Sequence, residues 1–94
     1  MEDKVKRHQE ICTLLNDTYR KKNHDYGDSF SDTYRKLGLI SCVTRITDKN
    51  NRLISLCTKK DDERQVLDES IIDTLLDEAN YCIMTVIELE ESKK

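Results

Sequence analysis

The chain has no proline, no tryptophan and only two glycines among its 94 residues. Because proline and glycine supply most tight turns, a fold of many short strands joined by such turns is disfavoured. The sequence also lacks a run of about 18 apolar residues, so we expect no membrane-spanning helix. Residues 1–10 are charged and contain no apolar segment, so we expect no signal peptide. A small all-helical protein is the simplest structure that these absences leave.

Cysteine is present, but its spacing does not indicate a metal site or a redox motif. The cysteines stand at positions 12, 42, 57 and 82, among apolar residues, and none forms a C-x-x-C pair. We therefore expect reduced thiols in a cytoplasmic protein and no structural zinc. The net charge of −3 argues against a direct nucleic-acid binder, which is usually basic. It does not exclude a nucleotide site, since a bound metal ion reverses the local charge.

Apolar residues that recur every three or four positions predict three long helices and one short helix. The expected ranges are about 2–22, 32–37, 39–59 and 68–90, with a loop over 23–30 and Asp68 as the cap of the last helix. Short connections favour a small antiparallel bundle in one domain, residues 1–94, of which about 88–94 form a polar tail. The last helix is apolar around most of its circumference, so we expect it to mediate a homo-oligomer, a dimer or tetramer.

An acidic stripe on the last predicted helix is the first candidate functional feature. On a helical wheel Asp73, Asp77 and Asn80 fall within about 60° of one another. Carboxylate and amide oxygens in such a stripe suit Mg²⁺ or Mn²⁺, and Asp48 on the neighbouring predicted helix could add another ligand. Alternatively, the stripe forms ion pairs with basic residues of that neighbouring helix. Those basic residues are Arg45, Lys49 and Arg52.

The segment 22–30 is the second candidate feature. Histidine is the side chain most often used as a base, so His24 could act as a base or contact a phosphate, with Asp25 orienting its ring. Tyr26 and Phe30 could stack on a nucleobase, and Lys22 could contact a phosphate. The alternative is a plain helix end in which the two aromatic rings anchor the core. No P-loop, dinucleotide-binding glycine motif or H-E-x-x-H motif is present, so those chemistries have no support.

Three blocks of the sequence, in this order, resemble one small family. The blocks are residues 22–30, 45–52 and 68–81. They are similar to the nucleotide-modification-associated domain of phages and bacteria, related to the MazG-like all-α NTP pyrophosphohydrolases. The resemblance implies Mg²⁺-dependent cleavage between the α- and β-phosphates of a nucleoside triphosphate. It also implies a protein of the cytoplasm, which is the host cytoplasm if a phage encodes it.

The sequence departs from the MazG-like pattern at both of its acidic motifs. Asp77-x-x-Asn80 matches the position of the later motif, but Asn80 replaces a carboxylate. Asp48-Lys49-x-x-Arg52 matches the position of the earlier motif, but Lys49 and Arg52 stand where acids are expected. Fewer anionic ligands mean weaker metal binding, so the resemblance supports nucleotide binding more firmly than turnover.

Two functional hypotheses follow. In the first, Asp48 and Asp77 are catalytic in a Mg²⁺-dependent pyrophosphohydrolase acting on a ribo- or deoxynucleotide. The metal ligands would be Asp48, Asp73, Asp77 and Asn80, and the substrate-binding residues Lys22, His24, Asp25, Tyr26, Arg45, Lys49 and Arg52. In the second, the same scaffold binds a nucleotide without catalysis, to sequester a nucleotide signal or to serve nucleotide modification. Metal dependence distinguishes the two hypotheses.

Overall fold

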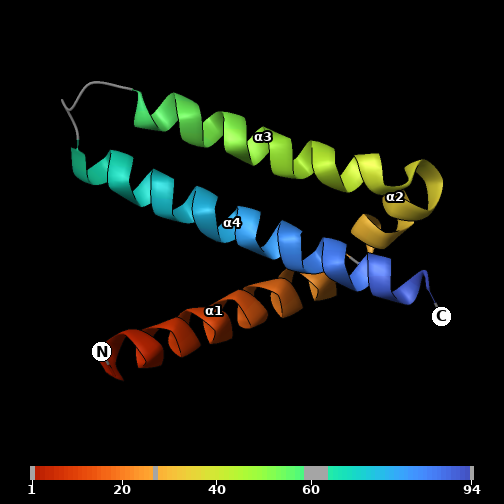
Figure 1. Ribbon diagram of the computed structural model, residues 1–94, viewed down its shortest axis with the longest axis horizontal. Coiled ribbons are helices and arrows are strands. Elements are labelled where there is room, and N and C mark those ends of the chain that lie inside the picture. The colour runs from red at the N-terminus through yellow and green to blue at the C-terminus, as the bar shows by residue number, and fades with distance from the viewer. Residues whose placement is uncertain (1, 27, 59–63, 94) are drawn as a thin grey trace.

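The computed structural model consists of α-helices and describes residues 2–26, 28–58 and 64–93 (Figure 1). The helices are α1 (Glu2–Tyr26), α2 (Ser29–Leu37), α3 (Leu39–Cys57) and α4 (Arg64–Glu91). Since the described residues contain no strand, the prediction of an all-helical fold is confirmed. In the same residues, no helix combines the length and the apolar character that crossing a membrane requires.

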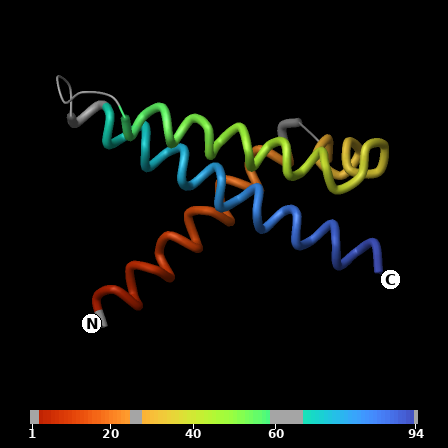
Figure 2. Tube along the Cα trace, turned by 45° about the horizontal axis from the view of Figure 1, so that its top comes forward, coloured from red at the N-terminus to blue at the C-terminus, as the bar shows by residue number. Residues whose placement is uncertain are grey.

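Helices α3 and α4 form an antiparallel hairpin that is the frame of the molecule, and they lie side by side in both Figure 1 and Figure 2. On α3 the side chains of Cys42 and Leu56 are buried. The Nε atom of Arg52 on α3 donates to the Thr74 hydroxyl on α4 at 3.2 Å. Thr74 is buried, and its hydroxyl in turn donates to the Ser70 carbonyl at 2.7 Å, so this polar contact between the helices is satisfied.

Helix α1 approaches the hairpin only over its carboxyl-terminal half. Leu15 is its buried apolar side chain, and the Asn80 side-chain amide of α4 donates to the Leu15 carbonyl at 3.1 Å. Residues 3–10 are all exposed, and α1 diverges from α4 toward its amino terminus in both views (Figures 1 and 2). This half is rich in charged residues, so it has little apolar surface to bury. The predicted bundle is therefore antiparallel in α3 and α4, with α1 crossing α4 at an angle.

The loop predicted over residues 23–30 is wrong in most of its length. Residues 23–26 continue α1, and α2 begins already at Ser29. Asn, His and Asp are weak helix formers, but propensity is a weak prior that tertiary contacts override. Here the ring of Phe30 packs on the ring of Tyr81, which gives the first turn of α2 a partner on α4. Asp28 holds the N-cap position of α2 without a side-chain cap hydrogen bond.

The ends of α4 also differ from the prediction. The helix begins at Arg64, so Asp68 lies inside it and is not its cap. At the other end the expected polar tail is helical as far as Glu91, and the Ser31 hydroxyl of α2 donates to the Glu88 carboxylate. This contact extends the folded part of α4 by about one turn. Of the connection between the predicted helices 39–59 and 68–90, residues 60–63 lie outside the described part of the chain, and residues 64–67 belong to α4.

Gly38 joins α2 to α3, as the sequence predicted for the end of the short helix. Its N–H donates to the Tyr34 carbonyl at 2.7 Å, and its own carbonyl accepts from the Ser41 N–H and hydroxyl at 3.1 and 2.8 Å. The backbone there has φ +80° and ψ −166°, a region that is essentially restricted to glycine. Gly38 is therefore the single residue between the end of α2 and the start of α3.

Candidate functional site

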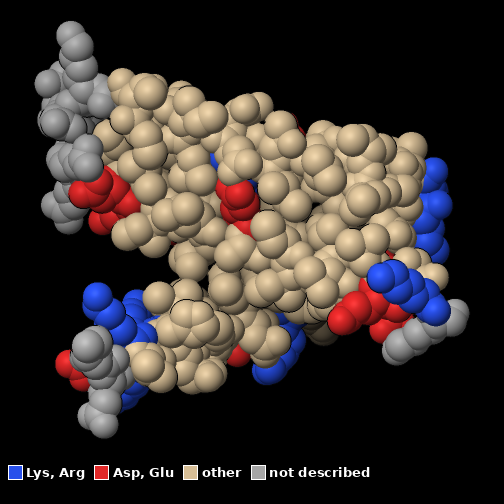
Figure 3. Space-filling view, in the orientation of Figure 1, with Lys and Arg blue, Asp and Glu red and all other residues tan. Residues whose placement is uncertain are grey.

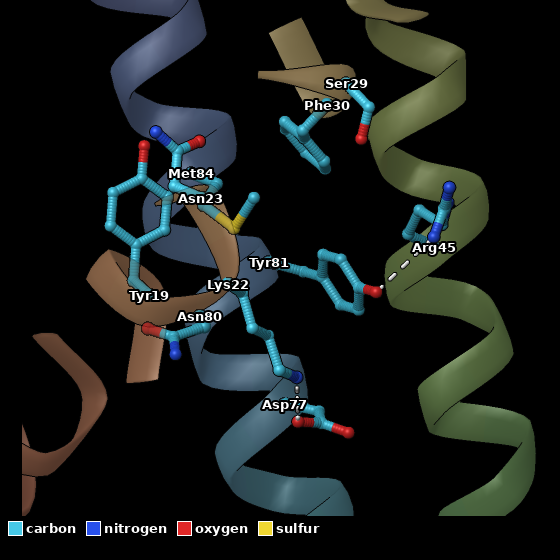
Figure 4. A pocket seen from close by; sticks show the side chains of 10 residues that line it. All are labelled: Tyr19, Lys22, Asn23, Ser29, Phe30, Arg45, Asp77, Asn80, Tyr81 and Met84. Carbon is cyan, nitrogen blue, oxygen red and sulfur yellow. Dashed lines mark hydrogen bonds and ion pairs between the residues drawn. The ribbon is translucent and has the colours of Figure 1, made fainter. Parts of the chain in front are cut away.

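All four helices contribute side chains to a hollow of about 210 Å³, named here the central pocket (Figure 4). Its lining residues are Tyr19, Lys22 and Asn23 of α1, Ser29 and Phe30 of α2, Arg45 of α3, and Asp77, Asn80, Tyr81 and Met84 of α4. Aromatic rings and charged groups thus face one small space.

Aromatic and thioether groups form the apolar part of the central pocket. The rings of Phe30 and Tyr81 are stacked, with centroids 6.0 Å apart and an angle of 22° between their planes. Tyr19 and Met84 add a third ring and a polarisable sulfur to the same lining (Figure 4). Such a surface favours a flat, apolar or π-electron-rich group.

A carboxylate with two ammonium partners lies at one edge of the central pocket. One oxygen of Asp77 is 3.2 Å from Lys49 Nζ, and the other is 3.7 Å from Lys22 Nζ. The Lys49 side chain is 26% exposed, whereas that of Lys22 is 63% exposed. Lys49 therefore belongs to the α3–α4 interface, and Lys22 is the cation that remains accessible at the mouth of the pocket.

Arg45 supplies a further cation on the α3 side. One of its terminal nitrogens donates to the Tyr81 hydroxyl at 3.4 Å, and its Cζ atom lies 5.8 Å from the centroid of the Tyr81 ring (Figure 4). A guanidinium carries five N–H donors, and this contact uses one of them. The geometry therefore allows Arg45 to contact an anion while it stays beside the aromatic rings.

A second hollow, named here the side hollow, lies where α1 meets α4. It is lined by Leu14, Leu15, Thr18, Asp73, Leu76, Asp77 and Asn80. Asp77 and Asn80 also line the central pocket, so the two hollows share one edge.

The structure brings three of the four predicted metal ligands together and leaves the fourth apart. Asp73, Asp77 and Asn80 all line the side hollow. Asp48 is exposed on α3 and lines neither hollow, because Lys49 is the residue there that faces α4. In the part of the chain that the structure describes, no group of three or more His, Cys, Asp or Glu side chains could hold a metal ion.

Of the predicted substrate-binding residues, Lys22 and Arg45 line the central pocket. Lys49 reaches it indirectly through Asp77, whereas Arg52 contacts Thr74, one turn away along α4. His24 is exposed on α1 and lines neither hollow. The side chains of the two remaining predicted residues lie outside the described part of the structure. These are Asp25 and Tyr26.

Several lining residues were not among the predicted site residues. Tyr19 and Tyr81 recur with the apolar positions of their helices, so their spacing is also that of core residues. Asn23 and Ser29 were assigned to a loop, and Met84 gave no signal of its own. The available signal was the aromatic content, because the chain has four tyrosines and one phenylalanine, of which three residues line this pocket.

Comparison with protein families gives a match to nucleotide modification associated domain 1 over residues 22–89. Every residue of the central pocket except Tyr19 lies within the matched segment. Comparisons with curated proteins and with solved structures gave no match. The matched segment covers more than half of the chain, so the protein belongs to the family of nucleotide modification associated domain 1.

Proposed function

We propose that the protein binds a nucleotide in the central pocket, with the base against the aromatic rings and the phosphate against Lys22 and Arg45. The observation that carries this proposal is the presence of a stacked aromatic pair and accessible cations in one hollow. A nucleotide needs both kinds of surface, because its base is a π-system and its phosphate is an anion. The description of the family supports the same class of ligand.

The size of the central pocket points to one base. Small-molecule sites usually measure about 300–1,000 Å³, and this pocket holds about 210 Å³. A base stacked beside Phe30 and Tyr81 would fill most of it. The sugar and phosphates would then lie at the open edge, where Lys22 is exposed.

The local charge favours an anion although the whole chain is acidic. Lys22 and Lys49 both contact the carboxylate of Asp77, and Arg45 lines the same pocket beside Tyr81, whereas the net charge of the chain is −3. Lys22 is held by Asp77 at 3.7 Å, a long and exposed contact that contributes little stability. It can therefore turn toward a phosphate at small cost.

Magnesium-dependent pyrophosphohydrolysis is the second candidate, favoured by the grouping of Asp73, Asp77 and Asn80 in the side hollow. When phosphates supply the remaining oxygens, Mg²⁺ can bind through one or two protein carboxylates, and it then stabilises charge on the reacting phosphate. The donor set fits this poorly, because Asp77 already faces two ammonium groups and Asp48 is elsewhere. We therefore place binding before hydrolysis.

A binding and turnover screen of the purified full chain tests the proposal. Ribo- and deoxynucleoside mono-, di- and triphosphates and cyclic nucleotides would be titrated calorimetrically with Mg²⁺, with Mn²⁺ and with EDTA. We expect binding that persists in EDTA, with the nucleotide recovered intact. Pyrophosphate release that disappears in EDTA would instead establish the second candidate, and the absence of any binding would overturn both.

Two adjacent lysines give a matched pair of variants for locating the ligand. Lys22 lines the central pocket, whereas Lys21 is exposed on α1 and lines neither hollow. Lys22→Met and Lys21→Met remove the same charge, so they change the net charge of the chain equally. We expect the first to weaken nucleotide binding and the second to leave it unchanged. Equal affinities in the two variants would place the ligand outside the central pocket.

A further inference from the structure

The side of the α3–α4 hairpin that is turned away from the central pocket exposes apolar residues, and we name it the outer face. It comprises Leu39, Val43, Ile54 and Cys57 of α3, and Leu75, Cys82 and Val86 of α4. These positions recur at steps of three, four or seven along each helix, except for the interval from Val43 to Ile54, which spans three turns, so each set lies on one side of its helix. Ile54 is 63% exposed, Val86 53% and Leu75 50%.

Charged residues are few on the outer face. On its α4 half the charged positions are Glu78 and, seven residues before Leu75, Asp68. On α3 three of the four charged side chains contact α4, through Asp77, Thr74 and Tyr81. Figure 3, which views the two helices from the front, accordingly shows few charged groups over their middle. In a chain with 37% charged residues, a row of exposed apolar side chains with so few charges among them indicates a surface that another molecule covers.

The total surface of the chain gives the size of what is left uncovered. A compact monomer of 11.1 kDa is expected to expose about 5,700 Å², but this chain exposes 7564 Å². Its radius of gyration is 15.4 Å, against about 12.4 Å for a compact domain of this length. Part of this excess of about 1,900 Å² belongs to the diverging amino-terminal half of α1. A standard interface buries about 800 Å² per partner, less than half of the excess, so the chain has enough uncovered surface for a stable dimer.

We propose that the outer face binds the outer face of a second copy of the same chain in a symmetric dimer. A two-fold axis lets one face cover itself, so the outer face can be buried without a different partner. A polar pair, Asn50 and Glu78, interrupts the apolar surface. With the Asn50 amide turned so that its nitrogen faces Glu78, the amide donates to both carboxylate oxygens, at 2.6 and 2.7 Å. An isolated polar group in an apolar interface fixes the register of the helices that meet there.

This proposal is independent of nucleotide binding. On α4 the outer-face residues Leu75, Cys82 and Val86 lie on the opposite side of the helix from Asp77 and Met84, which line the central pocket. A dimer formed through the outer face would therefore leave the pocket open. Failure of one proposal leaves the other unchanged.

Molar mass in solution tests the dimer. We expect light scattering after size exclusion to give about twice the chain mass of 11.1 kDa at micromolar concentration. Val86→Glu and Val43→Glu should each reduce the mass to that of one chain, because a buried, unpaired carboxylate opposes association. Both valines are exposed in the single chain, so far-UV circular dichroism should stay unchanged. Val5→Glu is the matched control, since Val5 is 75% exposed on α1 and lies off this face.

The rate at which each cysteine is alkylated shows which surface of the chain is covered. Cys57 and Cys82 are exposed on the outer face, Cys12 is exposed on α1, and Cys42 is buried. In a dimer through the outer face, we expect alkylation of Cys57 and Cys82 to be slowed at least tenfold relative to Cys12. In Val86→Glu all three exposed thiols should react at similar rates, and Cys42 should remain slow.

Two outcomes would overturn the proposal. A wild-type mass equal to one chain at high micromolar concentration removes the dimer itself. A dimeric mass combined with fast alkylation of Cys57 and Cys82 places the contact on another surface.

Discussion

At the scale of single residues, Tyr81 connects the apolar and the cationic parts of the central pocket. Its ring stacks on Phe30, and its hydroxyl accepts a hydrogen bond from Arg45. The ring and the hydroxyl therefore have separable roles. The ring would contribute to base stacking, and the hydroxyl would hold the guanidinium in position.

Substitution of Tyr81 separates these roles. Tyr81→Leu should weaken nucleotide binding by about 5- to 150-fold, because stacking of a base on an aromatic ring contributes about 1–3 kcal/mol. Tyr81→Phe keeps the ring and should lose only a few-fold in affinity through the less ordered Arg45. Isothermal titration calorimetry of both variants measures the difference. Equal losses in the two variants would contradict a stacking role for the ring.

Asp77 distinguishes a binding site from a catalytic metal site. Asp77→Asn removes the negative charge that faces Lys22 and Lys49 while keeping the size of the side chain. If the site binds nucleotide phosphates directly, affinity in EDTA should rise by about two- to fivefold, a range typical of exposed ion pairs. A metal-dependent hydrolase would instead lose turnover. Calorimetry and a pyrophosphate assay on the same preparation show which change occurs.

The candidate site could be predicted from the sequence only in part. Lys22 was predicted as a phosphate contact in the segment 22–30, and Arg45 as a basic residue of the helix that faces the acidic stripe; both line the central pocket. Asp48 was placed beside Asp73 and Asp77, but the rotation of α3 on α4 turns Lys49 toward Asp77 instead. That rotation depends on how side chains of both helices pack, which spacing along one helix does not determine.

At the scale of helices, the backbone conformation of Gly38 sets the direction of α2 relative to α3. Its φ of +80° with ψ of −166° is accessible to few residues other than glycine. A Cβ atom added there would meet nothing within 4 Å, so any cost of a side chain comes from the backbone alone. The direction of α2, and with it the position of Phe30, depends on this residue.

Replacement of this glycine should therefore destabilise the protein without a steric clash. Gly38→Ala is expected to lower the free energy of unfolding by on the order of 1–3 kcal/mol. Gly38→Asn should cost a similar amount, because asparagine relieves strain only in the left-handed helical region. Urea denaturation followed by circular dichroism measures both, with exposed Lys36→Ala in α2 as the control within about 0.5 kcal/mol of wild type. If Gly38→Ala left the free energy of unfolding unchanged, the prediction would be wrong, because the backbone at this junction would have shifted to accept a side chain.

The helices themselves were more predictable than their ends. The three- and four-residue spacing of apolar residues correctly predicted α3 and most of α4, because each of these helices buries one continuous side along its length. The start of α2 was missed because Ser29 and Phe30 follow residues typical of turns, and the contact between Phe30 and Tyr81 comes from a helix distant in sequence. Local propensity contains no information about such a contact.

At the scale of the whole molecule, the chain has a small core and a large surface. The buried apolar side chains among the described residues are Leu15, Cys42 and Leu56. One domain of 94 residues is marginal even with a good core, so this chain needs additional burial. Association through the outer face would supply it, and the stability of the fold would then depend on protein concentration.

Thermal unfolding at several concentrations measures this dependence. Because a dimer that unfolds to two separate chains is favoured by mass action, the wild-type melting temperature should rise as the protein concentration rises. In Val86→Glu, which cannot cover the outer face, the melting temperature should be lower and independent of concentration. Val5→Glu should keep the wild-type dependence, since residues 3–10 are exposed and lie outside the outer face. A wild-type melting temperature that is constant over a hundredfold range of concentration would contradict the dimer, because it would mean that a single chain is stable alone.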